Sequence, residues 1–201
     1  MPFKKGEYEK VLESPMRVKY KDVFEMKAFY ESLHEWCLQY GWMDLEEDKD
    51  HFETFYGEKI DKNGAKELWI QWRVYKDAEG APLRYYLDFH YHVLGLTPTE
   101  VVKEGIKLKA HKGEMELTMN GYVERKYQKD FKKNTFLNEI LGLFNKRIYR
   151  KEFEQRKKEL YQEMYVLQNF IKQWFKLKRY LPYEEARTMF SSYAWPSHLK
   201  E

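Results

Sequence analysis

Three side chains able to bind a metal alternate along the segment 83–94 (LRYYLDFHYHVL). Every second residue of an extended strand lies on the same face, so Asp88, His90 and His92 would lie side by side. Two imidazoles and one carboxylate can bind zinc or a non-haem iron. The spacing therefore predicts a metal site, which would make the protein a metal binder or an enzyme. The alternative is a polar sheet face whose side chains pack across neighbouring strands.

A nucleophilic thiol is the second chemical candidate. Cys37 is the single cysteine, and His34 lies three residues before it, on the same face of a helix. The neighbours Leu33 and Trp36 are apolar, which favours a buried structural thiol instead. The chain contains no P-loop, G-x-G-x-x-G, H-E-x-x-H, C-x-x-C or G-x-S-x-G motif. The sequence therefore favours a protein that is not an enzyme, and it predicts no cofactor.

A basic segment is the third candidate. Residues 125–180 carry 16 Lys and Arg against 6 Asp and Glu, with Tyr127, Phe131 and Tyr149 among them. Cations displace counterions from phosphates and aromatic rings stack on bases, so this composition suits RNA or DNA. The predicted nucleic-acid-binding residues are Lys146, Arg147, Arg150, Lys151, Arg156, Lys157 and Lys158. The alternative is a solvated charged helix, because no named nucleic-acid module is present.

A helix and a sheet must position these side chains. Residues 22–40 have helical periodicity, with Asp22 as the expected N-cap and Gly41 where a C-terminal glycine belongs. The period then changes to two, which predicts five strands over 51–60, 67–77, 83–94, 100–110 and 113–127. The separators are short and contain turn residues, so we expect an antiparallel meander rather than helical crossovers.

The C-terminal third is predicted to be helical. From 135 to 179 there is no proline and one glycine, which indicates a single helix of about 45 residues or two helices with a break. The expected fold class is α+β, with an N-terminal helix, a five-stranded antiparallel meander and a long C-terminal helix. The expected parts are a helix and sheet domain over 1–130, a basic then apolar helix over 131–181, and a short helix and tail over 182–201.

The apolar residues of 160–177 are spread too widely for one packing surface. They cover about 260° of the helix circumference, whereas a helix on one sheet face needs little more than about 100°. We therefore expect a structural or interaction protein that self-associates through this helix as a homo-oligomer. The predicted contact residues are Leu160, Met164, Leu167, Phe170, Ile171, Trp174 and Phe175.

Charge is divided between the two halves of the chain. Residues 1–124 hold 18 basic and 24 acidic side chains, a net charge of −6, whereas residues 125–180 have a net charge of +10. An acidic part and a basic helix are complementary between copies of the chain. The same helix would also suit an acidic protein or a nucleic acid, which stay open as alternative partners.

Composition excludes several classes of protein. Aromatic residues make up 18% of the 201 residues, which is too many for a disordered chain even though 34% are charged. The longest uncharged run, Thr188 to Leu199, has 12 residues, whereas a membrane-spanning helix needs about 20. The first residues lack the apolar stretch of a secretory signal. We therefore expect a cytoplasmic protein without a transmembrane segment.

Three aromatic-rich stretches carry a resemblance to a known group of proteins. They are His34–Cys37, Leu68–Val74 and Leu87–Gly95, and Gly113–Leu117 and the basic helical region follow them. This layout, over about residues 25–180, resembles that of a group of small uncharacterised archaeal proteins. The resemblance implies an intracellular protein and carries over no activity, cofactor or catalytic residue.

Overall fold

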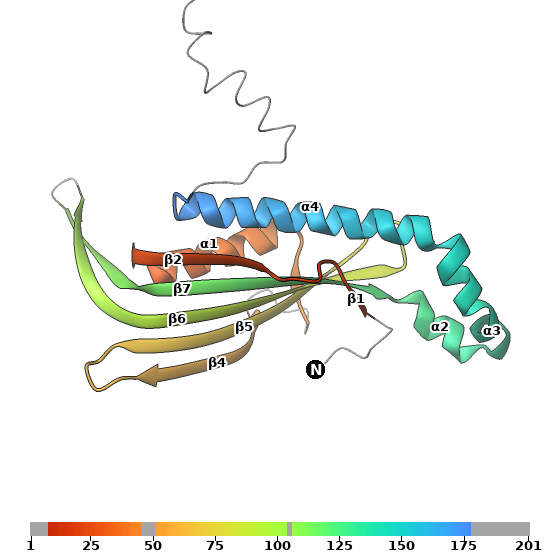
Figure 1. Ribbon diagram of the computed structural model, residues 1–201, viewed down its shortest axis with the longest axis horizontal. Coiled ribbons are helices and arrows are strands. Elements are labelled where there is room, and N and C mark those ends of the chain that lie inside the picture. The colour runs from red at the N-terminus through yellow and green to blue at the C-terminus, as the bar shows by residue number, and fades with distance from the viewer. Residues whose placement is uncertain (1–7, 46–50, 104–105, 178–201) are drawn as a thin grey trace, which may run out of the picture.

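An antiparallel sheet forms the centre of the protein (Figure 1). The computed structural model describes residues 8–45, 51–103 and 106–177. The strands are β1 (Tyr8–Lys10), β2 (Met16–Phe24), β3 (Met43–Asp44), β4 (Glu53–Ile60), β5 (Lys66–Asp77), β6 (Leu83–Lys103) and β7 (Ile106–Arg125). Across the sheet the order is β1-β7-β6-β5-β3, with β2 also paired to β7 and β4 also paired to β5.

The expected mixture of helices with a large antiparallel sheet is confirmed, but the expectation of five strands is wrong, because the sheet has seven. Both edges are made of two short strands. β1 and β2 pair with successive stretches of β7, and β3 and β4 pair with successive stretches of β5. The expectation that a helix comes first is also wrong, since β1 and β2 precede it. In β2 the exposed residues Arg17, Lys19 and Lys21 alternate with the less exposed Met16, Val18 and Tyr20, as in an edge strand.

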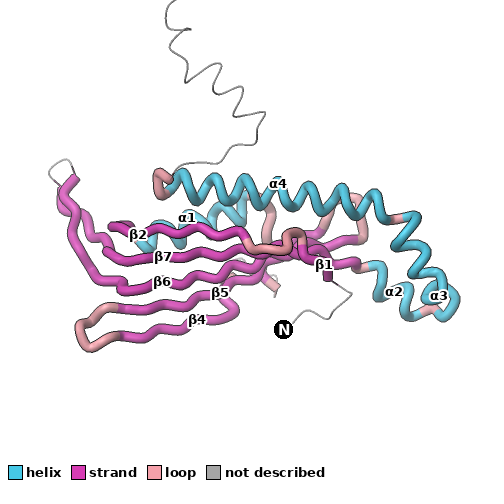
Figure 2. Tube along the Cα trace, in the orientation of Figure 1, coloured by secondary structure: helices cyan, strands magenta, loops and turns pink. Residues whose placement is uncertain are grey.

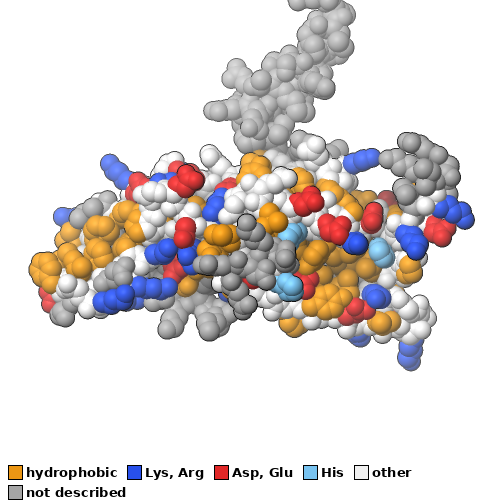
Figure 3. All heavy atoms as spheres, turned by 180° about the vertical axis from the view of Figure 1, so that it is seen from behind, with side chains coloured by type: hydrophobic (Ala, Val, Ile, Leu, Met, Phe, Trp, Pro, Cys, Tyr) orange, Lys and Arg blue, Asp and Glu red, His pale blue; other side chains and the backbone are white. Residues whose placement is uncertain are grey.

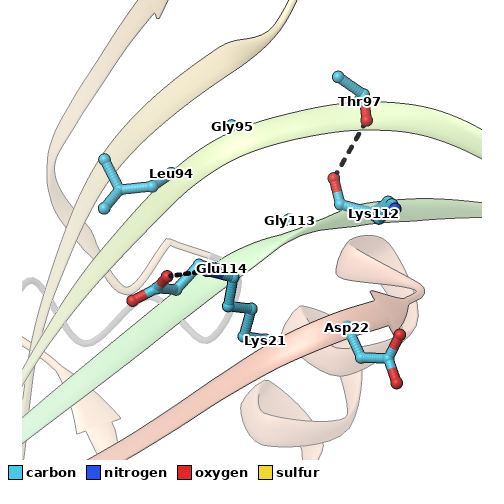
Figure 4. A pocket seen from close by; sticks show the side chains of 8 residues that line it. All are labelled: Lys21, Asp22, Leu94, Gly95, Thr97, Lys112, Gly113 and Glu114. Atoms are coloured by element: carbon cyan, nitrogen blue, oxygen red, sulfur yellow. Dashed lines mark hydrogen bonds and ion pairs between the residues drawn. The ribbon is translucent and has the colours of Figure 1, made fainter.

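The expected strand over 100–110 does not exist as a separate strand. β6 and β7 are 21 and 20 residues long and pair with each other along nearly their whole length. Gly95 has a φ of +62° and lies in the register shift between Leu94 and Thr97, so the chain bulges and bends there instead of reversing. Opposite the bulge, a Cβ on Gly113 would lie 3.1 Å from the carbonyl oxygen of Leu94 (Figure 4).

Helix α1 (Met26–Gln39) is shorter than expected at its start and ends as expected. The expected N-cap, Asp22, lies in β2, and the helix begins after Glu25. At the other end Gly41 has a φ of +75°, and its N–H donates to the carbonyl of Leu38 at 3.1 Å. This left-handed glycine closes the helix in the way that its position in the sequence indicates.

The C-terminal helical region is broken. It consists of α2 (Tyr127–Lys133), α3 (Thr135–Leu143), the π-helical segment η1 (Phe144–Ile148) and α4 (Arg150–Trp174). The N–H of Tyr149 donates to the carbonyl of Phe144, so the chain is wound more widely here than in an α-helix. On the N-terminal side of this break, α2 and α3 project from the end of the sheet as an arm (Figure 1). The expected short helix and tail over 182–201 lie outside the described residues.

Helices α1 and α4 cover one face of the sheet, and α4 runs in the direction of the strands (Figure 2). On this inner face Leu87, Phe89, Tyr91 and Val93 of β6 are at most 2% exposed, as their alternation indicates. The other face of the sheet carries the polar members of the same strands. Among the described residues, no helix has both the length and the apolar character needed to cross a bilayer.

The wide apolar arc of α4 is divided between two surfaces of the same chain. Leu160, Met164, Leu167 and Ile171 are at most 1% exposed and belong to the core cluster with the sheet. A second side of α4, together with the residue after it, packs against α1. There the ring of Phe29 lies 5.1 Å from Trp174 and 4.8 Å from Phe175, and Trp36 lies 6.4 Å from Phe170. The described chain therefore covers most of this arc itself.

Candidate ligand-binding groove

The three residues expected to bind a metal lie on the outer, polar face of the sheet, but Asp88 and His92 have other partners there. Arg73, opposite Asp88 in the register of β5 and β6, donates to both carboxylate oxygens at 2.7 and 2.6 Å. Nε2 of His92 lies 3.0 Å from a carboxylate oxygen of Glu67. Among the described residues, no three His, Cys, Asp or Glu side chains are grouped so that they could hold a metal ion. These contacts are those of a polar sheet face on which side chains of β5 and β6 pair with each other.

Cys37 lies on the side of α1 that faces the core and is fully buried. Burial raises the pKa of its thiol well above the ordinary value of 9.0, and the nearby carboxylate of Glu163 raises it further. A thiol with a raised pKa holds its proton and is a weak nucleophile. The ring of His34 stacks near Phe52, at 4.3 Å between centroids. These contacts agree with a structural thiol.

Most of the residues expected for self-association are buried within the folded chain. Five of the seven are buried in the core, and Phe170 and Trp174 are partly buried against it. The expectation of self-association rests on an arc too wide for one sheet to cover, and in this chain α1 covers a second part of it. What remains outside on α4 is Tyr161 and Val166, which are 41% and 45% exposed.

The residues expected to bind nucleic acid divide into two groups. Arg156 pairs with Glu152 and Glu159, and Lys157 pairs with Glu9, so these two cations contribute to the fold. The other described cations are exposed and form no ion pair with another described residue; they are Arg147, Arg150, Lys151 and Lys158. The side chain of Lys146 is outside those that the structure describes.

Glu9 joins β1 to two other elements, and this contact predicts a pH dependence. Its carboxylate accepts from Arg125 of β7 at 2.6 Å and from Lys157 of α4 at 2.7 Å. Partial burial opposes ionisation of Glu9, but the hydrogen bonds from Lys157 and Arg125 outweigh it, so its pKa is lower than the ordinary 4.5. A lowered pKa in the folded state stabilises the fold above pH 4.5, and this stabilisation is lost as the pH falls through the folded pKa.

We therefore expect Glu9→Gln to lower the free energy of unfolding by roughly 1 kcal/mol at pH 7, because half-exposed pairs are screened by solvent. The loss should become smaller as the pH falls, because the Glu9 carboxyl of the wild type is then increasingly protonated. Urea unfolding at pH 7 and pH 3 measures the difference, with Glu13→Gln as the control at an exposed glutamate. An equal loss at both pH values would show that the ion pairs are not its cause.

A groove lies on the inner face of the sheet, where the strands run beyond the first turns of α1. It has a volume of about 660 Å³. Residues from five elements line it: Met26, Lys27, Tyr30, Glu31, Glu53, Tyr56, Glu58, Lys66, Leu68, Ile70, Leu96, Pro98 and His111. The floor residues Met26, Leu68, Ile70 and Leu96 are at most 8% exposed. The rear view shows apolar side chains gathered in the half of the molecule that carries these strand ends (Figure 3).

Tyr30 and Tyr56 form the two aromatic walls of the groove. The hydroxyl of Tyr30 donates to Glu53 and accepts from Nε1 of Trp72 at 3.2 Å, so this ring is held in place from both sides. Burial raises the pKa of Tyr30 well above 10.0, and the hydrogen bond to Glu53 adds to the shift. Tyr56 lies on the solvent side, is 52% exposed and donates to Glu58 at 2.7 Å. The groove therefore has a fixed inner wall and an accessible outer wall.

Four of the five charged side chains in the lining form two ion pairs, and the fifth, Glu53, accepts the hydrogen bond from Tyr30. Lys66 pairs with Glu58 at 2.8 Å, and Lys27 pairs with Glu31 at 3.6 Å. The hydrogen bonds from Lys66 and then Tyr56 keep the pKa of Glu58 below 4.5. One polar atom in the lining lacks such a contact, since Nδ1 of His111 is buried and has no hydrogen-bond partner among the described residues. The groove thus presents an apolar surface, paired charges at its rim and one imidazole.

A second hollow follows the bend at Gly95 and does not have these properties (Figure 4). Its volume is about 730 Å³, but the only large apolar side chain in its lining is Leu94, which is 39% exposed. The other lining groups are the two glycines and polar residues, among which Lys21 pairs with Glu114 at 3.5 Å. This hollow is formed by the bulge in β6 and has no apolar floor.

The sequence does not predict a binding groove at this place. The alternation of Leu68 and Ile70 indicates that they share a face, and Met26 and Tyr30 are one helical turn apart. These two signals place apolar residues on the facing surfaces of α1 and β5. They do not show that β4, β6 and β7 extend far enough past α1 to leave a groove beside it.

Comparison of the chain with protein-family models and with curated protein sequences finds no match.

Proposed function

We propose that this protein binds a small, largely apolar molecule in the groove beside α1. The observation that carries the proposal is the nearly buried apolar floor of a groove of about 660 Å³ that opens to solvent. Ligand sites have volumes of about 300–1,000 Å³ and combine apolar linings with a few polar groups. The fixed ring of Tyr30 and the imidazole of His111 fit the second half of that description.

The charges around the groove restrict the chemistry of the ligand. Lys66 and Lys27 already have carboxylate partners, so a strongly charged ligand gains little by approaching them. A ligand with an apolar body fits best, because the floor of the groove is made of apolar side chains. The proposed ligand class is therefore an uncharged or weakly polar molecule of drug-like size.

The experiment is a titration with N-phenyl-1-naphthylamine, an uncharged apolar dye whose fluorescence rises in an apolar environment. We expect saturable binding to the wild-type protein. Tyr56→Ala removes the outer wall and should weaken binding about 5–30-fold, which corresponds to about 1–2 kcal/mol of lost aromatic contact. The matched control is Tyr161→Ala on α4, a tyrosine of similar exposure that lies outside the groove.

Two results would contradict the proposal. One is fluorescence that rises linearly with dye and never saturates, which is the behaviour of nonspecific adsorption. The other is equal weakening by Tyr56→Ala and Tyr161→Ala, because only Tyr56 belongs to the groove. Thermal unfolding of both variants shows whether either change disturbs the fold.

A further inference from the structure

The arm formed by α2 and α3 carries large apolar side chains in contact with solvent. Phe136, Ile140 and Leu143 of α3 are 69%, 40% and 57% exposed. Their spacing of four and three residues places them along one side of the helix. Three neighbouring apolar side chains at the end of a projecting arm form a stripe that the groove proposal does not use.

Aromatic side chains join α2 to the residues that follow α3, so both ends of the helix that carries the stripe are attached to a packed cluster. Phe131 and Phe144 have ring centroids 5.1 Å apart, and Tyr127 lies 5.1 Å from Tyr149. The hydroxyl of Tyr127 also donates to Oδ1 of Asn145 at 2.6 Å. Aromatic contacts of this kind join α2, η1 and the start of α4 into one cluster.

Cationic residues surround the stripe in sequence and in space. Residues 125–151 hold nine Lys and Arg against two Asp and Glu, a net charge of +7. Arg147, Arg150 and Lys151 follow α3 directly and are exposed. In the rear view, Lys and Arg side chains lie beside apolar ones at the end of the molecule that carries the arm (Figure 3). The arm therefore combines an exposed apolar stripe with positive charge.

We propose that the arm docks on the surface of an anionic lipid bilayer. Apolar side chains of an interfacial helix lie at the boundary between headgroups and acyl chains, while the cations contact anionic headgroups. A nucleic acid would use the cations but has no complement for exposed Ile140 and Leu143. A fluid bilayer also needs no matching groove, which suits three side chains on a projecting end. The proposal does not depend on the ligand groove.

Vesicle flotation tests this proposal with the full chain. The vesicles are phosphatidylcholine with roughly 30% phosphatidylserine, compared with pure phosphatidylcholine. We expect the protein to float with the anionic vesicles and to bind the neutral vesicles at least tenfold more weakly. The double variant Phe136→Ser/Leu143→Ser should lose about tenfold in affinity for the anionic vesicles. Phe55→Ser on β4 is the matched control, since Phe55 is 50% exposed but distant from the arm in sequence, and it should bind as the wild type does.

The triple variant Arg147→Glu/Arg150→Glu/Lys151→Glu should also lose binding, with Lys158→Glu as its smaller charge control. Absence of binding to anionic vesicles would overturn the proposal. Normal binding by Phe136→Ser/Leu143→Ser would overturn it as well, because the apolar stripe would then have no part. If the same protein binds single-stranded RNA more tightly than anionic vesicles, and only the charge variant weakens either, the surface recognises phosphate backbones instead.

Discussion

Replacement of Phe29 by alanine is expected to lower the free energy of unfolding by about 3–5 kcal/mol, the cost of deleting a buried aromatic ring and leaving a cavity. Phe29 is fully buried where α1, α4 and the sheet meet. Its ring contacts Trp174, Phe175 and Tyr91, at 5.1, 4.8 and 6.3 Å between centroids. The residue therefore joins the two helices that cover the sheet. Urea unfolding followed by circular dichroism measures the loss.

Phe136→Ala provides the matched control for this experiment. Phe136 is 69% exposed on the arm, so its removal should change stability by less than about 0.5 kcal/mol. A small loss in Phe29→Ala would mean that α1 does not pack on α4 as the structure has it. In that event the apolar arc of α4 would need another cover, and self-association through it would again be the best explanation.

Asp88→Ala is the second change with a large expected effect. Asp88 is 5% exposed and forms a bidentate pair with Arg73 across β5 and β6. Removal of one partner leaves a largely buried cation without its main acceptor, which costs about 3–5 kcal/mol. The double variant Arg73→Met/Asp88→Leu should regain much of this stability, because it removes both charges together.

The control for Asp88→Ala is Asp77→Ala, which breaks more exposed pairs with Arg84 and Lys126. Because those pairs are screened by water, their loss should cost no more than about 1 kcal/mol. Urea unfolding measures both losses of stability. A loss in Asp88→Ala as small as that in Asp77→Ala would contradict a stabilising role of the pair between Arg73 and Asp88. A gain in stability with added zinc that Asp88→Ala abolishes would instead revive the metal site.

Local patterns in the sequence predict the elements whose signals are local. The alternation in 83–94 correctly assigns Leu87 and Phe89 to the buried face and His90 to the other face. Gly41 ends α1 with a positive φ, as its position after a periodic segment indicates. In both cases the information lies within a few residues of the feature.

Other features depend on partners far away in the sequence. Glycine is typical of turns, but β6 continues through Gly95 because Thr97 and later residues pair with β7. The short strand β1 exists because it pairs with Val123 and its neighbours, more than 100 residues away. The apolar arc of residues 160–177 predicts contact with a second copy of the chain, because nothing in these residues shows that Phe29 of α1 packs against them.

The groove could not be predicted for the same reason. Met26 and Ile70 come to line one hollow only after α1 has packed on the sheet, and His111 reaches it only because β7 continues past the bulge opposite Gly95. The sequence shows each residue on the correct face of its own element. The relative lengths of the elements, which create the opening, are set by long-range pairing.

Methyl-resolved NMR during titration with N-phenyl-1-naphthylamine tests the proposed ligand site most directly. The floor of the groove carries methyl groups on Met26, Leu68, Ile70 and Leu96, and the arm carries others on Ile140 and Leu143. We expect saturable shifts in the four floor residues and none at Ile140 and Leu143. Shifts confined to Ile140 and Leu143, or an unchanged spectrum at saturating dye, would contradict a ligand site beside α1.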